Sequence, residues 1–551
     1  MSQPLQQTES IDAIATVYRA APGTEILYDQ ADEYGAESRR LHALQHVKKG
    51  DSHILLVPQP SLTDKNDPLL WSDLKKWAAF SNGLTYSFLG AVTGPIMAAG
   101  MIQLSEFFGE SLQKLTYANG ATLICQGVAT TIWMPFAIKY GRRPVYLLST
   151  ILMGVACIWL GVASTKSYTP FLIGRAFLGI FEAPIESIVP STITDIFFLH
   201  DRGAKISLYG LSVLGGNELG PMFSAFIIQA LGMNWAFFIV AIFVFLNAGT
   251  IFFAMPETKY TKTRPSITLQ AAVTTEKDIQ AKHVEDTGAQ EIELKRSYVS
   301  ELMVWSKGDP EVSLAKAFLR PLVLMAYPTV FYSCFLYGMS LSFNVILGAT
   351  TAQIFAPPPY LFSSSAQGLV FLSPFVGSLV GTYLCGPLAD TVANFYTKRN
   401  HGIREPEMRL PTCIIAAALT FLGALMAGLC LKYQTHWAGP VVGYGVLSAG
   451  AQMGATLGMN YAIDCHKELS VELMVTIASL KSAVAWIWTW VINDWLARDG
   501  PLVVFCVVAS INVVVYLGSF VMYWKGKSIR VWLAEYNMLG RLGLDDQRLS
   551  H

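Results

Sequence analysis

Three ionisable side chains interrupt a stretch that is otherwise long and apolar enough to cross a bilayer. They are Arg175, Glu182 and Glu186, in the stretch from residue 171 to residue 195. An ionisable side chain at the middle of a membrane costs at least about 3 kcal/mol, so it persists mainly where a partner, a water-filled cavity or a transported charge compensates for it. Since the successive spacings are seven and four residues, all three side chains are expected on one helix face.

Glu182 and Glu186 are candidates for a proton carrier. Two carboxylates one helical turn apart in a low dielectric resist being ionised together, which is the property that a proton carrier needs. A simpler role stays open for Glu186, which could form a hydrogen bond to a neighbouring helix. Pro184 and Pro190 lie in the same stretch, where a proline frees a backbone carbonyl and permits a bend beside a cavity.

Two more charged residues lie within other apolar stretches. Glu218 stands beside Asn217 and between Gly216 and Gly220, whose spacing lets another helix approach the backbone closely. We expect Glu218 and Asn217 to face a cavity. Lys481 is about ten residues into its stretch, a depth from which its amine does not easily reach the membrane surface. It could neutralise a carboxylate across the cavity or contact an anionic substrate.

Further polar and aromatic residues are candidates for the lining of this cavity. Asn344, Asn460, Tyr461 and Asp464 belong here, although polar side chains in membrane helices often only bond to one another. Aromatic side chains could offer a stacking surface to an amphiphilic substrate, or could be packing and interface anchors. The aromatic candidates are Tyr327, Phe331, Tyr332, Phe335, Trp486, Trp488 and Trp490.

The composition is that of a polytopic membrane protein. The chain has 551 residues, of which 52% are hydrophobic and only 14% charged, and the mean hydropathy is +0.41. The net charge of zero gives no indication of nucleic-acid binding. The eight cysteines lie in or at the ends of apolar stretches, without metal-ligand spacing, so we expect neither a disulfide framework nor a metal site or other cofactor.

About twelve apolar stretches have the length that a bilayer core requires. A long polar stretch separates the sixth from the seventh, so we predict an all-α fold of twelve transmembrane helices in two pseudo-symmetric six-helix bundles. The predicted regions are a disordered tail (1–54), an N-terminal bundle (55–256), a central loop (257–320), a C-terminal bundle (321–525) and a second tail (526–551). The predicted spans are 78–102, 117–138, 145–164, 170–194, 205–230, 234–255, 321–347, 366–388, 411–431, 438–463, 471–495 and 501–524.

The distribution of Lys and Arg predicts the orientation. Basic residues gather in the loops after the even-numbered stretches, so both tails and the central loop are expected to be cytoplasmic. About seventy polar residues precede the first apolar stretch, so we expect no cleavable signal peptide of the usual kind.

A faint internal repeat supports two related halves. The second stretch ends in MPFAIKYGRRPVY and the eighth ends in GPLADTVANFYTKR. The first string keeps a basic turn without its acidic residue, and the second keeps the acidic residue without the basic turn. Such repeats are typical of secondary transporters.

In this order, several strings resemble the major facilitator superfamily, and specifically fungal twelve-helix members of its drug:proton antiporter branch. The strings are VPQPS, DPLLWS, KYGRRPVY, GRAFLGIFEAPIES, the pair Gly220 and Pro221, PET at 256–258, GPLAD and REPEMRLP. The resemblance implies alternating access by two bundles around a central cavity, driven most often by the proton gradient. It also implies that Arg175, with Gly179 one turn on, biases the protonation of a nearby carboxylate. A buried ion pair that only locks two helices is the other possibility for Arg175.

Two motifs depart from the family pattern. Met134 and Ile138 replace the glycine and aspartate of the loop motif, so its acidic partner must come from elsewhere, and Asp195 is the candidate. After Pro221 the usual glycines are missing, which makes export less firmly indicated than transport itself. The predicted cytoplasmic gate, which could also be simple positive-inside anchoring, consists of Lys139, Gly141, Arg142, Arg143, Asp195, Arg202 and Asp390.

The leading functional hypothesis is proton-coupled export of drug-like or secondary-metabolite compounds by a monomer in a fungal plasma membrane. Its partners would be a small-molecule substrate, protons and lipid. The alternative within transport is uptake of a small organic cation such as a polyamine. A membrane enzyme is disfavoured, because there is no intramembrane histidine, no phosphate-binding glycine loop and no Ser/His/Asp arrangement. A transporter-like sensor would need a larger folded extension than the tail and central loop provide.

Overall fold

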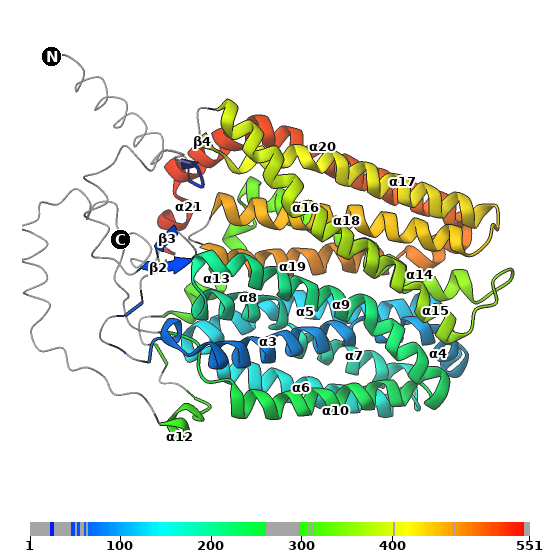
Figure 1. Cartoon of the computed structure of the whole chain (residues 1–551). Coiled ribbons are helices and arrows are strands. Elements are labelled where there is room, and N and C mark those ends of the chain that lie inside the picture. The colour runs from blue at the N-terminus through cyan, green and yellow to red at the C-terminus, as the bar shows by residue number, and fades with distance from the viewer. Residues whose placement is uncertain are drawn as a thin grey trace, which may run out of the picture.

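Long helices run side by side along one axis of the molecule, as Figure 1 shows. The computed structural model describes residues 22–26, 46–49, 52–55, 60–61, 64, 66–260, 297–305, 308–309, 312–400, 403–466 and 469–544. The short helices α12 (Tyr298–Glu301) and α21 (Met538–Arg541) lie at one end, which we call the tail end. The helices α4 (Met101–Phe108) and α15 (Ser364–Val370) lie at the other end, which we call the far end.

The N-terminal bundle begins where Asp67 accepts a hydrogen bond from the backbone of Leu69 at 3.0 Å and so caps the first turn. Its elements are η1 (Pro68–Leu70), α3 (Asp73–Thr93), η2 (Pro95–Gly100), α4, α5 (Leu112–Tyr140), α6 (Arg142–Ala163), α7 (Tyr168–Glu182), α8 (Ile185–Ile196), α9 (Leu199–Leu231) and α10 (Met233–Ala254).

The C-terminal bundle repeats this pattern of long helices. Its last helix bends at Gly500, whose φ of 79° lies in the left-handed region that favours glycine. The elements are α13 (Leu314–Leu324), α14 (Pro328–Phe355), α15, α16 (Leu372–Arg399), η4 (Pro406–Thr412), α17 (Cys413–Lys432), α18 (Ala438–Cys465), α19 (Ser470–Thr489) and α20 (Ile492–Tyr536).

The predicted all-α fold is confirmed. Within the described residues, ten helical stretches are long and apolar enough to cross a membrane. The pair α7 and α8 and the glycine-rich α18 supply the other two of the twelve predicted spans. The glycines of α16 let it approach α18 closely, since a Cβ at Gly377 would lie 1.9 Å from the carbonyl oxygen of Gly445.

The fourth predicted span is not one continuous helix. α7 ends at Glu182 and α8 begins at Ile185, with Pro184 between them. Proline has no N–H to donate, so the helical hydrogen bonding is interrupted at this point. The backbone angles of Ala183 and Pro184 stay in the right-handed helical region, so the chain continues its helical turn to Glu186 beyond the break.

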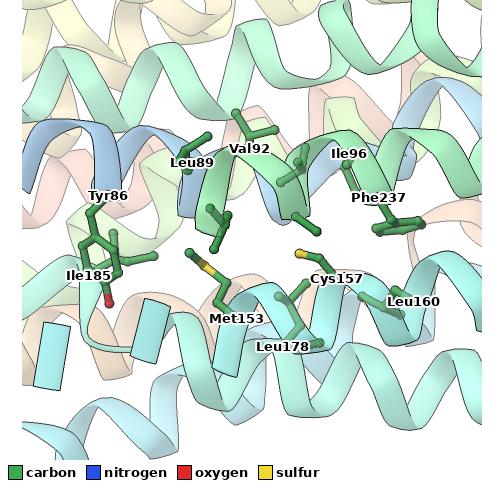
Figure 2. Packing of buried hydrophobic residues seen from close by; sticks show 14 of the residues in the cluster. Tyr86, Leu89, Val92, Ile96, Met153, Cys157, Leu160, Leu178, Ile185 and Phe237 are labelled. Atoms are coloured by element: carbon green, nitrogen blue, oxygen red, sulfur yellow. The ribbon is translucent and has the colours of Figure 1, made fainter. Parts of the chain in front are cut away.

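The core of the N-terminal bundle is built from apolar side chains of η2 and of every helix from α3 to α10. Figure 2 shows α3 and η2 side chains packing against residues of α6, α7, α8 and α10. Met153 and Leu160 of α6 and Leu178 of α7 are fully buried in this layer. This packing fixes the end of α3 against α7, where Arg175 and Glu182 lie.

Four short strands lie at the tail end. β1 (Glu25–Ile26) pairs antiparallel with β4 (Ile403–Arg404), and β2 (His46–Lys49) pairs with β3 (Ser52–Leu55). The prediction of a wholly disordered tail over residues 1–54 is therefore wrong for these segments. The segment at β1 contacts distant residues, including β4 and Arg530, and composition does not report such contacts. Most of the predicted central loop and residues 545–551 of the second tail lie outside the described residues.

Candidate functional site

Two adjoining pockets lie between the N-terminal and C-terminal bundles, and together we call them the central cavity. Their cavity volumes are about 80 and about 110 Å³. Both are bordered by Asn119, Asn217 and Asn344. The pocket nearer the middle of the bundles also has Glu182, Glu186, Gln126, Thr122 and Lys481 in its lining.

Arg175 is completely buried and secures the end of α3. Its guanidinium donates hydrogen bonds to the carbonyl oxygens of Thr93 at 2.8 Å and Gly94 at 2.7 Å, and to the side-chain oxygen of Asn119 at 3.2 Å. The last carbonyls of a helix lack intrahelical partners, and Pro95 cannot supply an N–H, so Arg175 satisfies them.

Thr93 links Arg175 to Glu182. Its hydroxyl donates to a carboxylate oxygen of Glu182 at 2.5 Å, while its carbonyl accepts from Arg175. Glu182 is 3% exposed and borders the cavity. Thr93 is thus hydrogen-bonded to both Arg175 and Glu182. The sequence alone did not indicate this arrangement.

Lys481 of α19 forms an ion pair with Glu186 of α8. Both side chains are 15% exposed, and the pair joins the two bundles across the central cavity. The nearby hydroxyl of Ser479 donates to the carbonyl oxygen of Gly127 at 2.8 Å, which adds a second link at the same level. Of the two roles considered for Lys481, the structure shows the neutralisation of a carboxylate.

Asn217 and Glu218 point in different directions. Asn217 borders the cavity, facing Asn344 of the other bundle. Glu218 is 2% exposed and does not belong to the lining of either pocket, so the expectation that it faces the cavity is wrong. The cause is the helical rotation of about 100° between successive residues.

Asn460 and Tyr461 were expected in the lining, but neither borders the two pockets. Tyr461 is buried near the tail end, where its hydroxyl donates to a carboxylate oxygen of Glu407 at 3.4 Å. None of the seven aromatic candidates borders the cavity either. Phe331 and Trp490 are each 50% exposed on the outside of the bundles, where aromatic side chains can meet lipid.

The first gate cluster lies where α6 begins. Arg142 forms an ion pair with Asp195 at the end of α8, with Nε 2.7 Å from a carboxylate oxygen. Glu257 accepts hydrogen bonds from the backbone N–H groups of Arg142 at 2.9 Å and Arg143 at 3.1 Å. Its carboxylate thereby caps the positive end of α6, a role that we did not predict although the PET string contains it.

The other basic residues of this region bind backbone carbonyls. Arg143 is 2% exposed and donates to the carbonyl oxygens of Phe252 and Glu301. Arg202 donates to Thr194 at 2.7 Å and Phe197 at 3.0 Å and so closes the end of α8. Gly141 permits the turn between α5 and α6 with a φ of 103°. The side chain of Lys139 lies beside the ring of Tyr140, 5.9 Å from its centre.

A matching charge cluster lies at the tail end of the C-terminal bundle. Asp390 of α16 pairs with Arg404 and Arg409, each at 3.0 Å, and Arg409 also pairs with Asp464 of α18 at 2.6 Å. Asp464 therefore belongs to this cluster and not to the cavity. Asp390, the acidic residue of the GPLAD string, thus forms ion pairs with the two arginines of the REPEMRLP string.

Arg530 anchors a second, buried cluster that we did not predict. It is 0% exposed and pairs with Glu405 at 2.6 Å and Glu407 at 2.8 Å. It also donates to the carbonyl oxygen of Pro22, and the hydroxyl of Thr24 donates to Glu405 at 2.9 Å. The alternating charges of REPEMRLP were the sequence signal for this cluster. The residues that bind Glu405 and Glu407 in this cluster lie more than a hundred residues away in either direction, so the sequence did not identify them.

The charge of Glu405 is stabilised at this site. Burial alone would raise its pKa, but hydrogen bonds from Lys527 and Arg530 outweigh burial and hold the pKa below its ordinary value.

Hydrogen bonds join the two bundles at the far end. The side chain of Gln113 in α5 donates to the carbonyl oxygen of Thr489 at 2.7 Å and accepts from the backbone of Asn493 at 3.0 Å. The side chain of Gln229 accepts from the backbone of Ser365 at 2.9 Å. These contacts would have to break before the cavity could open toward the far side.

Comparison with known proteins agrees with this architecture. Residues 77–464 match the model of the Major Facilitator Superfamily. An uncharacterised MFS-type transporter of Schizosaccharomyces pombe is 24% identical over 93% of each chain. Protein HOL1 of Saccharomyces cerevisiae is 25% identical, covering 88% of this chain and 92% of HOL1. The MFS transporter cpaT of Aspergillus oryzae is 26% identical over 77% of this chain and 81% of its own.

Solved structures share the fold. The xylose transporter XylE from E. coli, in a partially occluded inward-open conformation, superposes with a TM-score of 0.56 at 14% identity, covering 82% of this chain and 98% of its own. A POT family transporter in complex with 5-aminolevulinic acid gives a TM-score of 0.55 at 12% identity, covering 81% and 96%. With twelve spans in two bundles around a central cavity and a family match over most of its length, the chain belongs to the major facilitator superfamily and is a membrane transporter.

Proposed function

We propose that this transporter moves a small organic cation, such as a polyamine, by proton-coupled alternating access. The observation that carries the proposal is the charge of the central cavity. Glu182 and Glu186 border it together with a single lysine, Lys481, which leaves one carboxylate in excess. The other polar lining groups include the amides of Asn119, Asn217 and Asn344, which can accept hydrogen bonds from an ammonium group.

The ion pair between Lys481 and Glu186 suggests how a cation binds. In the substrate-free protein the lysine amine satisfies the carboxylate, which would otherwise be a costly unpaired charge. An incoming ammonium group can replace the lysine at Glu186. The substrate would then weaken a link between the two bundles in the act of binding, which couples occupancy to their relative movement.

The apolar part of the lining supports an aliphatic substrate. Toward the far end the cavity is bordered by Met97, Ala98, Met101, Val345 and Ala349. Neither pocket has an aromatic side chain in its lining. Methylene groups pack well against such a surface, whereas a planar drug-like cation would find no stacking partner.

Export of a drug-like or secondary-metabolite compound is the second candidate, and the resemblance to drug:proton antiporters favoured it in the sequence. The apolar end of the cavity would suit an amphiphilic compound of this kind. The direction of transport, the plasma-membrane location, the cytoplasmic tails and the monomeric state remain predictions from the sequence.

Proton coupling requires a carboxylate that changes its protonation state during the cycle. Glu186 is neutralised by Lys481, which leaves Glu182 and Glu218 as buried carboxylates for which the structure shows no ion pair among the described residues. We propose that one of these two carries the proton-dependent step.

Transport by the purified protein in lipid vesicles tests the proposal. We expect a radiolabelled aliphatic diamine to accumulate against its gradient when a pH gradient is imposed, and a protonophore to abolish the accumulation. An uncharged diol of the same chain length is the matched control substrate. Equal transport of diamine and diol, or accumulation that ignores the protonophore, would contradict the proposal. Imposing the gradient in each direction distinguishes uptake from export.

A further inference from the structure

Glu218 is a buried carboxylate at the interface between the two bundles, outside the cavity. It is 2% exposed, and one of its carboxylate oxygens is buried without a hydrogen-bond partner. A buried ionised carboxylate without a partner is strongly disfavoured, so such a group neutralises by taking up a proton.

The contacts of neighbouring residues on α9 show which way Glu218 faces. One turn toward the far end, the backbone of Met222 lies beside Gly368 of α15, and a Cβ on Gly368 would approach Ala225 to 2.4 Å. One turn toward the tail end, a Cβ on Gly215 would lie 4.0 Å from the ring of Phe375 in α16. Residues 215, 218, 222 and 225 share one helix face, so Glu218 faces the junction of α15 and α16 in the opposite bundle.

The elements packed around this position carry no compensating charge. At the level of Glu218, the segments 88–100 of α3 and η2, 341–349 of α14, 364–380 of α15 and α16, and the whole of α10 contain no Asp, Glu, Lys, Arg or His. α8 contacts α9 farther toward the tail end, where Glu186 is paired with Lys481 and Asp195 with Arg142. The hydroxyl of Tyr209, on α9 itself, lies 3.4 Å from the carbonyl oxygen of Ile185.

We propose that Glu218 is a protonation-controlled contact between the two bundles. It holds a proton while α9 is closed against α15 and α16, as in this structure, and ionises when the far end opens and water reaches it. Ionisation therefore favours the far-open state, and protonation favours the far-closed state. Glu182 differs, because it borders the cavity and accepts a hydrogen bond from Thr93 at 2.5 Å. The proton-dependent step and the substrate site would thus lie in separate places.

The inference rests on alternating opening, which is part of the proposed function, but not on the identity of the substrate. Its test accordingly measures conformation without substrate. Spin labels at Phe107 and Tyr433, both well exposed near the far end of opposite bundles, report the far-end opening in a cysteine-substituted protein in lipid. Their distance distribution is recorded by pulsed electron spin resonance across a pH series.

We expect the fraction of the longer, far-open distance to rise with pH, by up to tenfold per pH unit, because one proton is released on opening. Glu218→Gln, which imitates the protonated form, should keep the short distance at every pH. Glu218→Asp retains an ionisable group and should retain the pH response, which guards against a merely structural effect of the substitution. Glu535→Gln, which changes an exposed carboxylate of α20 far from the cavity, is the control and should respond as the unsubstituted protein does.

Two results would overturn the inference. One is an unsubstituted protein whose distances do not change with pH. The other is a Glu218→Gln protein that keeps the full pH response. Diamine transport is measured in a separate experiment. A failure of the spin-label test would therefore not contradict the proposed substrate class, and a failure of diamine transport would not contradict the role of Glu218.

Discussion

Lys481 and Glu186 form an ion pair that connects the eleventh span to the fourth across the central cavity. Glu186 lies just beyond the break at Pro184, in the first turn of α8. Glu182, on the other side of the break, keeps its contacts with Thr93 inside the N-terminal bundle. The fourth span therefore supplies two carboxylates with different partners, Glu182 within its own bundle and Glu186 across the cavity.

Substitution of this pair should separate binding from turnover. Glu186→Gln removes the carboxylate that an ammonium group would contact, so we expect the apparent affinity for an aliphatic diamine to fall at least about tenfold, or about 1.4 kcal/mol. Lys481→Ala leaves Glu186 unpaired, so the diamine should bind more tightly but leave more slowly. The measurement is the KM and maximal rate of transport in vesicles.

The doubly substituted protein is the control for this prediction. If the two residues act through each other, the effects of Glu186→Gln and Lys481→Ala will not add. Additive effects, or a lysine substitution that weakens diamine binding as much as the glutamine substitution does, would show that the pair is only a structural link.

The sequence indicated the architecture well and the site only in part. Length, hydropathy and the repeated loop strings led to twelve spans in two bundles, because these properties are local. Arg175, Glu182, Asn217 and Lys481 were recognised because a polar group in an apolar stretch is conspicuous. Glu218 was assigned to the cavity wrongly, since one residue of helical rotation decides between cavity and interface, and no nearby residue reveals that rotation.

Contacts between distant segments account for the rest. Thr93 gave no signal, because a threonine near a helix end is common in any membrane protein. Glu257 and Arg530 lie beyond the last span of each half, and each binds a loop that belongs to a different part of the sequence. Asp195 was predicted by a different argument. The loop motif lacks its usual aspartate, so an acidic residue from another element was expected to replace it.

Disruption of the pair between Arg142 and Asp195 should slow transport without removing substrate binding. The pair joins the start of α6 to the end of α8 at the tail end, with side chains 11% and 18% exposed. We expect Asp195→Asn and Arg142→Gln each to lower the maximal rate severalfold at unchanged KM, and the double substitution to be no worse than either. Lys139→Gln, which changes a neighbouring charge, is the control. A normal maximal rate in both single variants would show that these residues only set the membrane topology and have no role in gating.

Weakening the far-end contacts should favour opening on that side. Gln113 is 3% exposed and bridges Thr489 and Asn493 of the other bundle. Gln113→Ala leaves these backbone groups unsatisfied and should destabilise the closed far end by about 1–3 kcal/mol. A membrane-impermeant thiol reagent applied from the far side should then label a cysteine at Asn344 more than fivefold faster. Gln103→Ala, which removes an exposed link to Ser364, should have a smaller effect. Equal labelling rates in all three proteins would contradict this role of Gln113.

The buried cluster at Arg530 should make stability depend on acid pH. The pKa of Glu405 is held below its ordinary value in the folded protein, so its stabilising contribution is complete above the unfolded value of about 4.3 and is lost as the pH falls through the lower, folded value. Glu405→Gln should flatten this part of the profile of thermal unfolding in detergent. Arg530→Met leaves the buried carboxylate of Glu407 without its ion-pair partner and Glu405 with Lys527 alone, so we expect a loss of about 3–5 kcal/mol.

Residues 22–26 provide an independent check on this cluster. Gly23 adopts a φ of 86°, and a Cβ there would lie 2.4 Å from the carbonyl oxygen of Asp464, so Gly23→Ala should displace the segment from its site. The substituted protein should lose part of the stability that the Arg530 cluster supplies, as should a protein that lacks residues 1–26. A protein lacking only residues 1–21 keeps Pro22 and Thr24 and should unfold at the original temperature. Equal unfolding temperatures for the two truncated proteins would show that the segment does not brace the C-terminal bundle.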